Sequence, residues 1–311
     1  MLIVSMYSNW LSRIKMGYLA KLAIKIRGSL NKSVNPDFVE ELKISDKISK
    51  IIHQTYHTKN LPDSIKNNIN QLKVDNPDWE FRLYDDQDIE HYMESYFPSL
   101  LPIYKKINPV YGAAKADFFR YLVVYKDGGV YLDIKSGASK SLNSIIKDND
   151  KYILSHWPRS YPKIMLGQHV DITNPIGEFQ QWHIISVAGH PFLRAVINNV
   201  CNNINHYNPT LHEYGAFGVF NLTGPIAYTE TIYRMLNKHP YRLEKDHLDV
   251  GLIYCAIDQT DPLSGHHKVF TKKHYSLIEE PVVIQSKLMS ILFYTLLPLI
   301  KFMKSKLKAS M

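Results

Sequence analysis

The chain has 311 residues, enough for one large or two modest domains with a substantial core. Hydrophobic residues make up 45% and charged residues 21%, ordinary values for a globular protein that exclude a disordered or low-complexity chain. The formal net charge of +8 arises at the ends, because residues 1–36 hold six Lys and Arg, residues 281–311 hold five, and neither stretch holds an acid. The 26 basic and 29 acidic residues between them leave a slightly acidic body, which argues against nucleic acid as a partner.

Both basic ends are also apolar. Residues 2–26 mix Leu, Ile, Met and aromatic side chains with scattered Lys and Arg, which favours an amphipathic helix in a membrane interface. Leu288–Ile300 is uncharged but, at 13 residues, too short to span a bilayer as a helix, and a lysine cluster follows it. We expect peripheral membrane contact through both termini. The alternative is that each end packs on the domain with its lysines in water.

Cysteine usage indicates the compartment. Cys201 and Cys255 stand in apolar surroundings without metal-type spacing, so neither a zinc site nor a disulfide framework is expected. A reducing compartment is the simpler assumption. Together with the two ends, this predicts a cytoplasmic location, peripheral at the inner face of the cell membrane.

Strands and helices alternate through the first part of the chain. Lys50–Thr55 is predicted to form a strand, and Pro62-Asp63 opens a helix to about residue 75. Trp79–Tyr84 alternates like a second strand, and Asp85 caps a helix through about Tyr96. This alternation predicts an α/β fold with a mainly parallel central sheet.

The next segment carries the most chemistry. An amphipathic helix over Tyr111–Lys126 ends in the Gly128-Gly129 turn, and a short β-prone run then brings Asp133 to a strand end. Asp117 and Arg120 are three residues apart and share a helix face. With Asp133 they could form a polar cluster that grips sugar hydroxyls and a phosphate. The alternative is an ordinary helix–turn–strand unit with a helical ion pair.

Beyond this segment the pattern is weaker. Lys151–Ser155 and Trp182–Val187 resemble strands, and Pro191 starts a helix to about Asn205. The Thr223-Gly224-Pro225 turn begins another helix, predicted to reach about residue 238. No linker divides the chain here.

Five ordered blocks resemble a known family. AAKADFFRYLVVYKDGGVYLDIKSGASKSL, starting at Ala113, looks like the core signature of the sugar-transferring proteins related to yeast initiation mannosyltransferases, glycosyltransferase family 32. The other matching blocks are Lys50–Tyr56, Asn76–Tyr84, Trp182–Phe192 and Leu222–Thr229. The resemblance covers about residues 48–280, which predicts one glycosyltransferase domain between a basic amphipathic segment, 1–36, and a hydrophobic-basic segment, 285–311.

The resemblance implies a GT-A-like fold that binds a nucleotide-diphosphate sugar and transfers the sugar with retention; distant cousins among glucosylating toxins share the motif layout. It implies that Asp117 and Arg120 hold the donor sugar, and that Asp133 contacts the ribose or sugar and helps to hold a divalent cation. The nucleotide-binding residues that it implies are His53, Gln54, Thr55 and Tyr56.

One position departs from the family pattern. Lys135 stands where the second acid of the Asp-x-Asp motif is expected, which weakens a site for Mn²⁺ or Mg²⁺ because such ions prefer oxygen ligands. Lys135 could itself supply the positive charge that a diphosphate leaving group needs, which makes Asp133 and Lys135 the candidate catalytic residues. Alternatively, Asp133 and His274 could retain a weakly held ion.

The leading hypothesis is therefore a retaining glycosyltransferase that moves a hexose or N-acetylhexosamine to a glycan acceptor. The basic, apolar ends of the chain favour a lipid-linked acceptor. Surface polysaccharide or lipopolysaccharide biosynthesis is the natural setting. The alternative is a non-catalytic protein that binds nucleotide sugar or glycan in a polysaccharide assembly complex.

Overall fold

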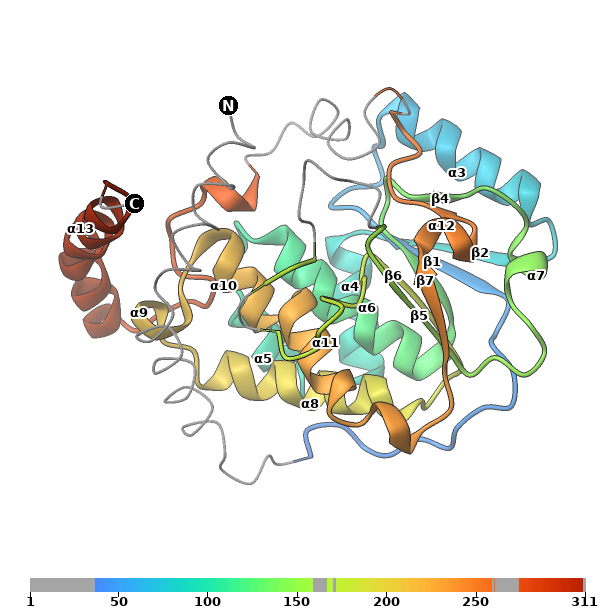
Figure 1. Cartoon of the computed structure of the whole chain (residues 1–311), viewed down its shortest axis with the longest axis horizontal. Coiled ribbons are helices and arrows are strands. Elements are labelled where there is room, and N and C mark those ends of the chain that lie inside the picture. The colour runs from blue at the N-terminus through green and yellow to red at the C-terminus, as the bar shows by residue number, and fades with distance from the viewer. Residues whose placement is uncertain (1–36, 159–166, 170–171, 259, 261–273, 310–311) are drawn as a thin grey trace.

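The computed structural model describes residues 37–158, 167–169, 172–258, 260 and 274–309. The predicted N-terminal amphipathic segment lies outside these residues. A six-stranded sheet forms the centre, in the order β2-β1-β3-β6-β5-β7 (Figure 1). Its strands are β1 (Ile51–Thr55), β2 (Glu80–Tyr84), β3 (Gly129–Leu132), β5 (Tyr152–His156), β6 (His183–Ser186) and β7 (Arg242–Asp246).

Strand direction confirms the predicted α/β fold with a mainly parallel sheet. β1 is parallel to β2 and β3, β5 is parallel to β7, and β6 runs antiparallel between β3 and β5. The chain leaves β1 for β2 on one side and returns to β3 on the other. The carboxyl ends of β1 and β3 therefore flank a topological switch point, where α/β sheets bind ligands.

Helices cover both faces of the sheet. α3 (Asp63–Asp75) packs through Leu72 into the cluster that contains Val130 and Leu132 of β3. Tyr131, between them, points to the opposite face and joins the core formed with α6 (Gly112–Asp127) and α8 (Pro191–Asn205). This alternation along β3 places α6 beside the switch point.

The double glycine sets the direction of the chain between α6 and β3. Gly128 and Gly129 have φ angles of 69° and 96°, in the region that favours glycine. A Cβ atom on Gly129 would lie 2.5 Å from the carbonyl oxygen of Ile51. The turn therefore needs glycine both for its backbone angles and for the close approach to β1.

Some helix ends lie where the sequence predicts them, and others do not. Asp85 forms a capping box with Asp88 at the start of α4 (Asp86–Tyr96), as expected. The next helix, α5 (Leu101–Lys105), follows a turn over residues 98–100. α11 (Pro225–Tyr233) ends before residue 238, where a short 3₁₀ turn leads into Pro240. The residue before a proline is biased away from helical angles.

The second half contains elements that the pattern did not indicate. β7 has the charged sequence RLEKD and alternating exposure, as suits a strand at the sheet edge. A small antiparallel sheet pairs β4 (Gly137–Ala138) with β8 (Leu252–Ile253). The remaining helices are α7 (Leu142–Ile145), α9 (Pro209–His212), α10 (Gly215–Leu222) and α12 (His247–Val250), with 3₁₀ turns η1 (Leu236–Lys238) and η3 (Tyr275–Leu277).

The C-terminal segment forms helix α13 (Lys287–Ala309), at the end of the molecule remote from β1 and β2 (Figure 1). Phe293 anchors it, with no exposed surface and its ring centre 5.6 Å from that of Tyr214. In the described part of the chain, no helix combines the length and the apolar character needed to cross a bilayer. The predicted domain limits stay a prediction.

Candidate functional site

Four charged side chains converge beyond the carboxyl end of β3. Arg120 Nη2 lies 3.0 Å from Asp117 Oδ1 and 3.1 Å from Asp133 Oδ1, and Lys135 Nζ lies 2.8 Å from Asp133 Oδ2. The structure thus brings together the helix-borne pair and the residues after the double glycine, at the switch point. The side chain of Asp133 is 21% exposed and those of Asp117 and Arg120 are 5% exposed, so Asp133 is more open to a ligand.

Neighbouring groups hold Arg120 in place. Its Nη1 donates to both the backbone oxygen and Oε1 of Gln181, each at 2.7 Å. Its guanidinium carbon also lies 4.7 Å from the centre of the Tyr131 ring, a cation–π contact. Arg120 is therefore fixed in one orientation behind Asp133 and keeps a positive charge there.

Asp117 is enclosed by hydrogen-bond donors. Gln181 Nε2 donates to Oδ1 at 3.1 Å, and Thr223 Oγ1 donates to Oδ2 at 3.1 Å. Burial raises the pKa of the Asp117 carboxyl to about 6, although the Arg120 guanidinium acts in the opposite direction. Asp117 is a buried partner that orients Arg120.

The residues at the end of β1 take different positions. His53 is fully buried, with Nδ1 3.1 Å from the Tyr84 hydroxyl and Nε2 3.0 Å from the Gly128 oxygen, so a direct contact with a nucleobase is not supported. Gln54 Nε2 donates to the backbone oxygen of Asp133 at 3.2 Å and braces the site. Thr55 Oγ1 lies 3.0 Å from the Tyr131 hydroxyl. Tyr56 is half-buried just beyond the strand, and its role beside a base stays a prediction.

The side chains around Asp133 do not fit a divalent metal ion. Mn²⁺ and Mg²⁺ need several oxygen ligands, whereas the two oxygens of Asp133 already face a guanidinium and an ammonium. No group of three His, Cys, Asp or Glu side chains in the described residues could hold a metal. His274 Nδ1 lies 2.7 Å from Ser276 Oγ at the start of η3. The predicted Asp133–His274 metal site stays a prediction.

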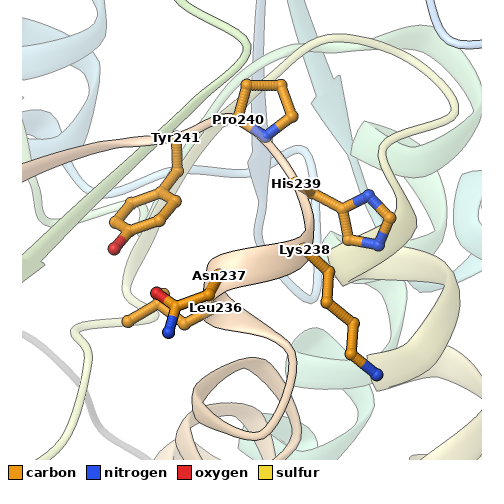
Figure 2. A pocket seen from close by; sticks show the side chains of 6 residues that line it. All are labelled: Leu236, Asn237, Lys238, His239, Pro240 and Tyr241. Atoms are coloured by element: carbon orange, nitrogen blue, oxygen red, sulfur yellow. The ribbon is translucent and has the colours of Figure 1, made fainter.

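A surface hollow lined by residues 236–241 lies elsewhere (Figure 2). It adjoins the start of β7, which runs parallel to β5 and hence in the same direction as β3. The amino end of β7 and the carboxyl end of β3 therefore lie at opposite ends of the strands in the sheet. This hollow is separate from the charged cluster.

Three residues of the site had no predicted role. Thr223 lies within a block that carries the family resemblance, and Gln181 immediately precedes another. Tyr254 places its ring 4.4 Å from Lys135 Nζ. The two blocks were the available signal for Gln181 and Thr223, whereas nothing local in the sequence distinguishes Tyr254.

Comparison with known proteins finds a family match over the segment that holds the charged cluster. Residues 62–152, which include all four charged side chains, match the family described as "Glycosyltransferase sugar-binding region containing DXD motif". This match confirms the resemblance that the sequence blocks predicted.

Individual relatives are enzymes named for sugar transfer. The chain is 27% identical over 203 residues to inositol phosphoceramide mannosyltransferase 1 of Schizosaccharomyces pombe, covering 64% of this chain and 56% of the relative. It is 29% identical over 182 residues to the initiation-specific alpha-1,6-mannosyltransferase of Candida albicans, covering 52% and 45% respectively. The chain thus spans about half the length of these relatives. A solved structure, PaToxG glycosyltransferase, has a TM-score of 0.42 at 18% identity, covering 72% of this chain and 81% of that one.

Proposed function

We propose that this protein is a glycosyltransferase that moves a hexose from a nucleotide-diphosphate sugar to a glycan or glycolipid acceptor. The observation that carries the proposal is the cluster of Asp117, Arg120, Asp133 and Lys135 at the switch point, inside the family-matching region. Buried, oriented charges of both signs suit a ligand with hydroxyl groups and a diphosphate. Asp133 and Lys135 contact the donor, and Arg120 and Asp117 orient Asp133.

Mannose is the first sugar to test, because both relatives described above are named mannosyltransferases. An N-acetylhexosamine is the second. One relative is named for a ceramide-based acceptor, which supports an acceptor carried by a lipid. Retention of anomeric configuration and a role in surface polysaccharide or lipopolysaccharide synthesis remain part of the proposal. The one-bond coupling between C1 and H1 of the product tests retention.

The experiment measures release of nucleoside diphosphate from a donor panel that includes GDP-mannose, UDP-glucose and UDP-N-acetylglucosamine. We expect turnover with one donor, and a fall of about a hundredfold or more in Asp133→Asn and Arg120→Ala, because each removes oriented charge. Asp148→Asn is the matched control, because Asp148 is 95% exposed and pairs with Lys47 on the surface. Unchanged turnover in both site variants contradicts the assignment, and donor binding without turnover supports the non-catalytic alternative.

We further propose that α13 contacts an anionic membrane at the inner face of the cell membrane. Its Leu288 and Ile291 are 76% and 66% exposed, so an apolar face of the helix has no partner within the described chain. Residues 281–311 carry five lysines and no acid, which complements anionic headgroups. An acceptor in the leaflet would then lie near the enzyme.

Co-sedimentation with phosphatidylglycerol vesicles tests this contact. We expect the wild-type protein to sediment with them at low salt, and less with phosphatidylcholine vesicles. The double variant Leu288→Asp with Ile291→Asp should stay in the supernatant. Val74→Asp is the control, since Val74 is an apolar residue on α3 that is 71% exposed. Equal sedimentation of all three proteins contradicts membrane binding through α13.

A further inference from the structure

The ionic partners of Asp133 differ from those of a metal-binding carboxylate. Its Oδ1 faces Arg120 Nη2 at 3.1 Å, and its Oδ2 faces Lys135 Nζ at 2.8 Å. Lys135 also occupies the position of the second acid in the Asp-x-Asp pattern. The cation nearest to the open carboxylate is therefore a side chain of the protein itself.

Formal charge explains how this arrangement is balanced. Among the residues that the structure describes, the cluster holds two acids, Asp117 and Asp133, and two bases, Arg120 and Lys135, so their formal charges sum to zero without any ion. If Lys135 were an aspartate, the same cluster would carry two excess negative charges, which one divalent cation would neutralise. Lys135 thus contributes the same net charge as an aspartate together with a bound divalent ion. In the absence of a donor, a divalent ion added beside Lys135 would leave excess positive charge in a buried site.

The surroundings of Lys135 keep its ammonium charged and positioned. The side chain is 8% exposed, and Nζ lies 4.4 Å from the centre of the Tyr254 ring. Burial favours the neutral amine, but Asp133 and Tyr254 raise the pKa of Lys135 above its ordinary value. Its backbone oxygen accepts a hydrogen bond of 2.8 Å from Ala256 N, which fixes the local chain.

We propose that the Lys135 ammonium does the electrostatic work of the metal ion in Asp-x-Asp transferases, so that donor binding and transfer need no divalent cation. The inference rests on the proposed function. In the transfer, the acceptor hydroxyl oxygen forms a bond to the anomeric carbon as the bond from that carbon to the diphosphate oxygen breaks. The electron pair stays on the diphosphate, Lys135 stabilises the resulting charge, and the hydroxyl proton passes to a diphosphate oxygen.

Calorimetric titration of the full chain with GDP and UDP, in EDTA and in Mn²⁺, tests the proposal. We expect one nucleotide to bind wild-type protein with affinities that agree within about threefold in the two conditions. Lys135→Met should weaken binding by about tenfold or more in both, because it removes the charge but keeps the stem, and Lys135→Arg should restore most of it. Lys140→Met is the control, because Lys140 is an exposed lysine five residues along the chain.

Lys135→Asp provides a gain-of-function arm. This variant recreates two acids, so we expect weak nucleotide binding in EDTA, recovery in Mn²⁺, and a bound Mn²⁺ signal in electron paramagnetic resonance. Two results would overturn the role of Lys135: wild-type binding that is at least tenfold tighter in Mn²⁺ than in EDTA, or Lys135→Met binding as tightly as wild type. Either result leaves the transferase proposal intact. If neither nucleotide binds in any condition, the proposed function itself fails. Circular dichroism checks the fold of each variant. If Lys135→Asp unfolds the protein, the binding data for Lys135→Met and Lys135→Arg decide the role of Lys135.

Discussion

Gln181 connects Arg120 to Asp117 from a segment more than 60 residues away. Its Oε1 accepts from Arg120 Nη1 at 2.7 Å, and its Nε2 donates to Asp117 Oδ1 at 3.1 Å. One amide group therefore bridges the base and the acid of the helix pair, in addition to their direct ion pair. The orientation of the charged cluster depends on this bridge.

Gln181→Ala should consequently impair the site more than the fold. We expect a loss of about 1–3 kcal/mol in the free energy of unfolding, because buried partners lose hydrogen bonds, and a higher KM for the donor. Steady-state kinetics and denaturant titration measure the two effects. Gln71→Ala, which alters an exposed hydrogen bond to Asp75 on α3, is the control. Identical kinetics of both variants would show that the bridge does not orient the site.

Gly129 should tolerate no side chain. Gly129→Ala forces a Cβ atom against the Ile51 oxygen at a φ of 96°, so we expect destabilisation by about 2 kcal/mol or more. Gly112→Ala is the control, because nothing lies within 4 Å of its Cβ position at the start of α6. It should be neutral or slightly stabilising. Equal melting temperatures for the two variants would contradict the close packing of the turn on β1.

Buried histidines should make the fold sensitive to acid. Burial lowers the pKa of His53 to about 4 and that of His183 to about 3, below the ordinary value of 6.5. Because these pKa values are lower in the folded protein than in the unfolded chain, only the unfolded chain takes up protons as the pH falls below 6.5. The free energy of unfolding is therefore full above pH 6.5 and decreases as the pH falls towards 4. At pH 5 the loss is about 2 kcal/mol for each such histidine.

Denaturant titration between pH 7.5 and pH 5 measures this dependence. His53→Gln should lose less stability over the interval than wild type, because it removes one group that must take up a proton on unfolding. His91→Gln, at an exposed position of α4, should follow the wild-type curve. A His53→Gln curve parallel to wild type would rule out a titrating His53.

Phe293 should control the attachment of α13. It is fully buried, whereas its neighbour Leu292 is 46% exposed. Phe293→Ala removes the anchor and should release the helix locally, at a cost of about 3 kcal/mol. Limited proteolysis should then cut near residue 287 about a hundredfold faster, while Leu292→Ala behaves like wild type. Equal cleavage of the two variants would place the anchor elsewhere.

The sequence alone determined the first half of the fold. The strand at Ile51–Thr55, the capping box at Asp85 and the Gly128-Gly129 turn depend on neighbouring residues and on local periodicity, so they could be predicted in order. The same local pattern placed Asp117 and Arg120 on one helix face and Asp133 at a strand end. β7 escaped prediction because an exposed, charged edge strand lacks the apolar alternation that marks a half-buried one.

Only the tertiary structure decided what surrounds these charges. Gln181, Thr223 and Tyr254 reach the cluster from distant parts of the chain, and no local period encodes hydrogen bonds between such segments. Folding likewise turned His53 into the core and placed cationic groups on both oxygens of Asp133. The sequence therefore specified which charges meet, and three-dimensional packing specified their partners and exposure, because burial and long-range pairing arise only when the sheet and helices assemble.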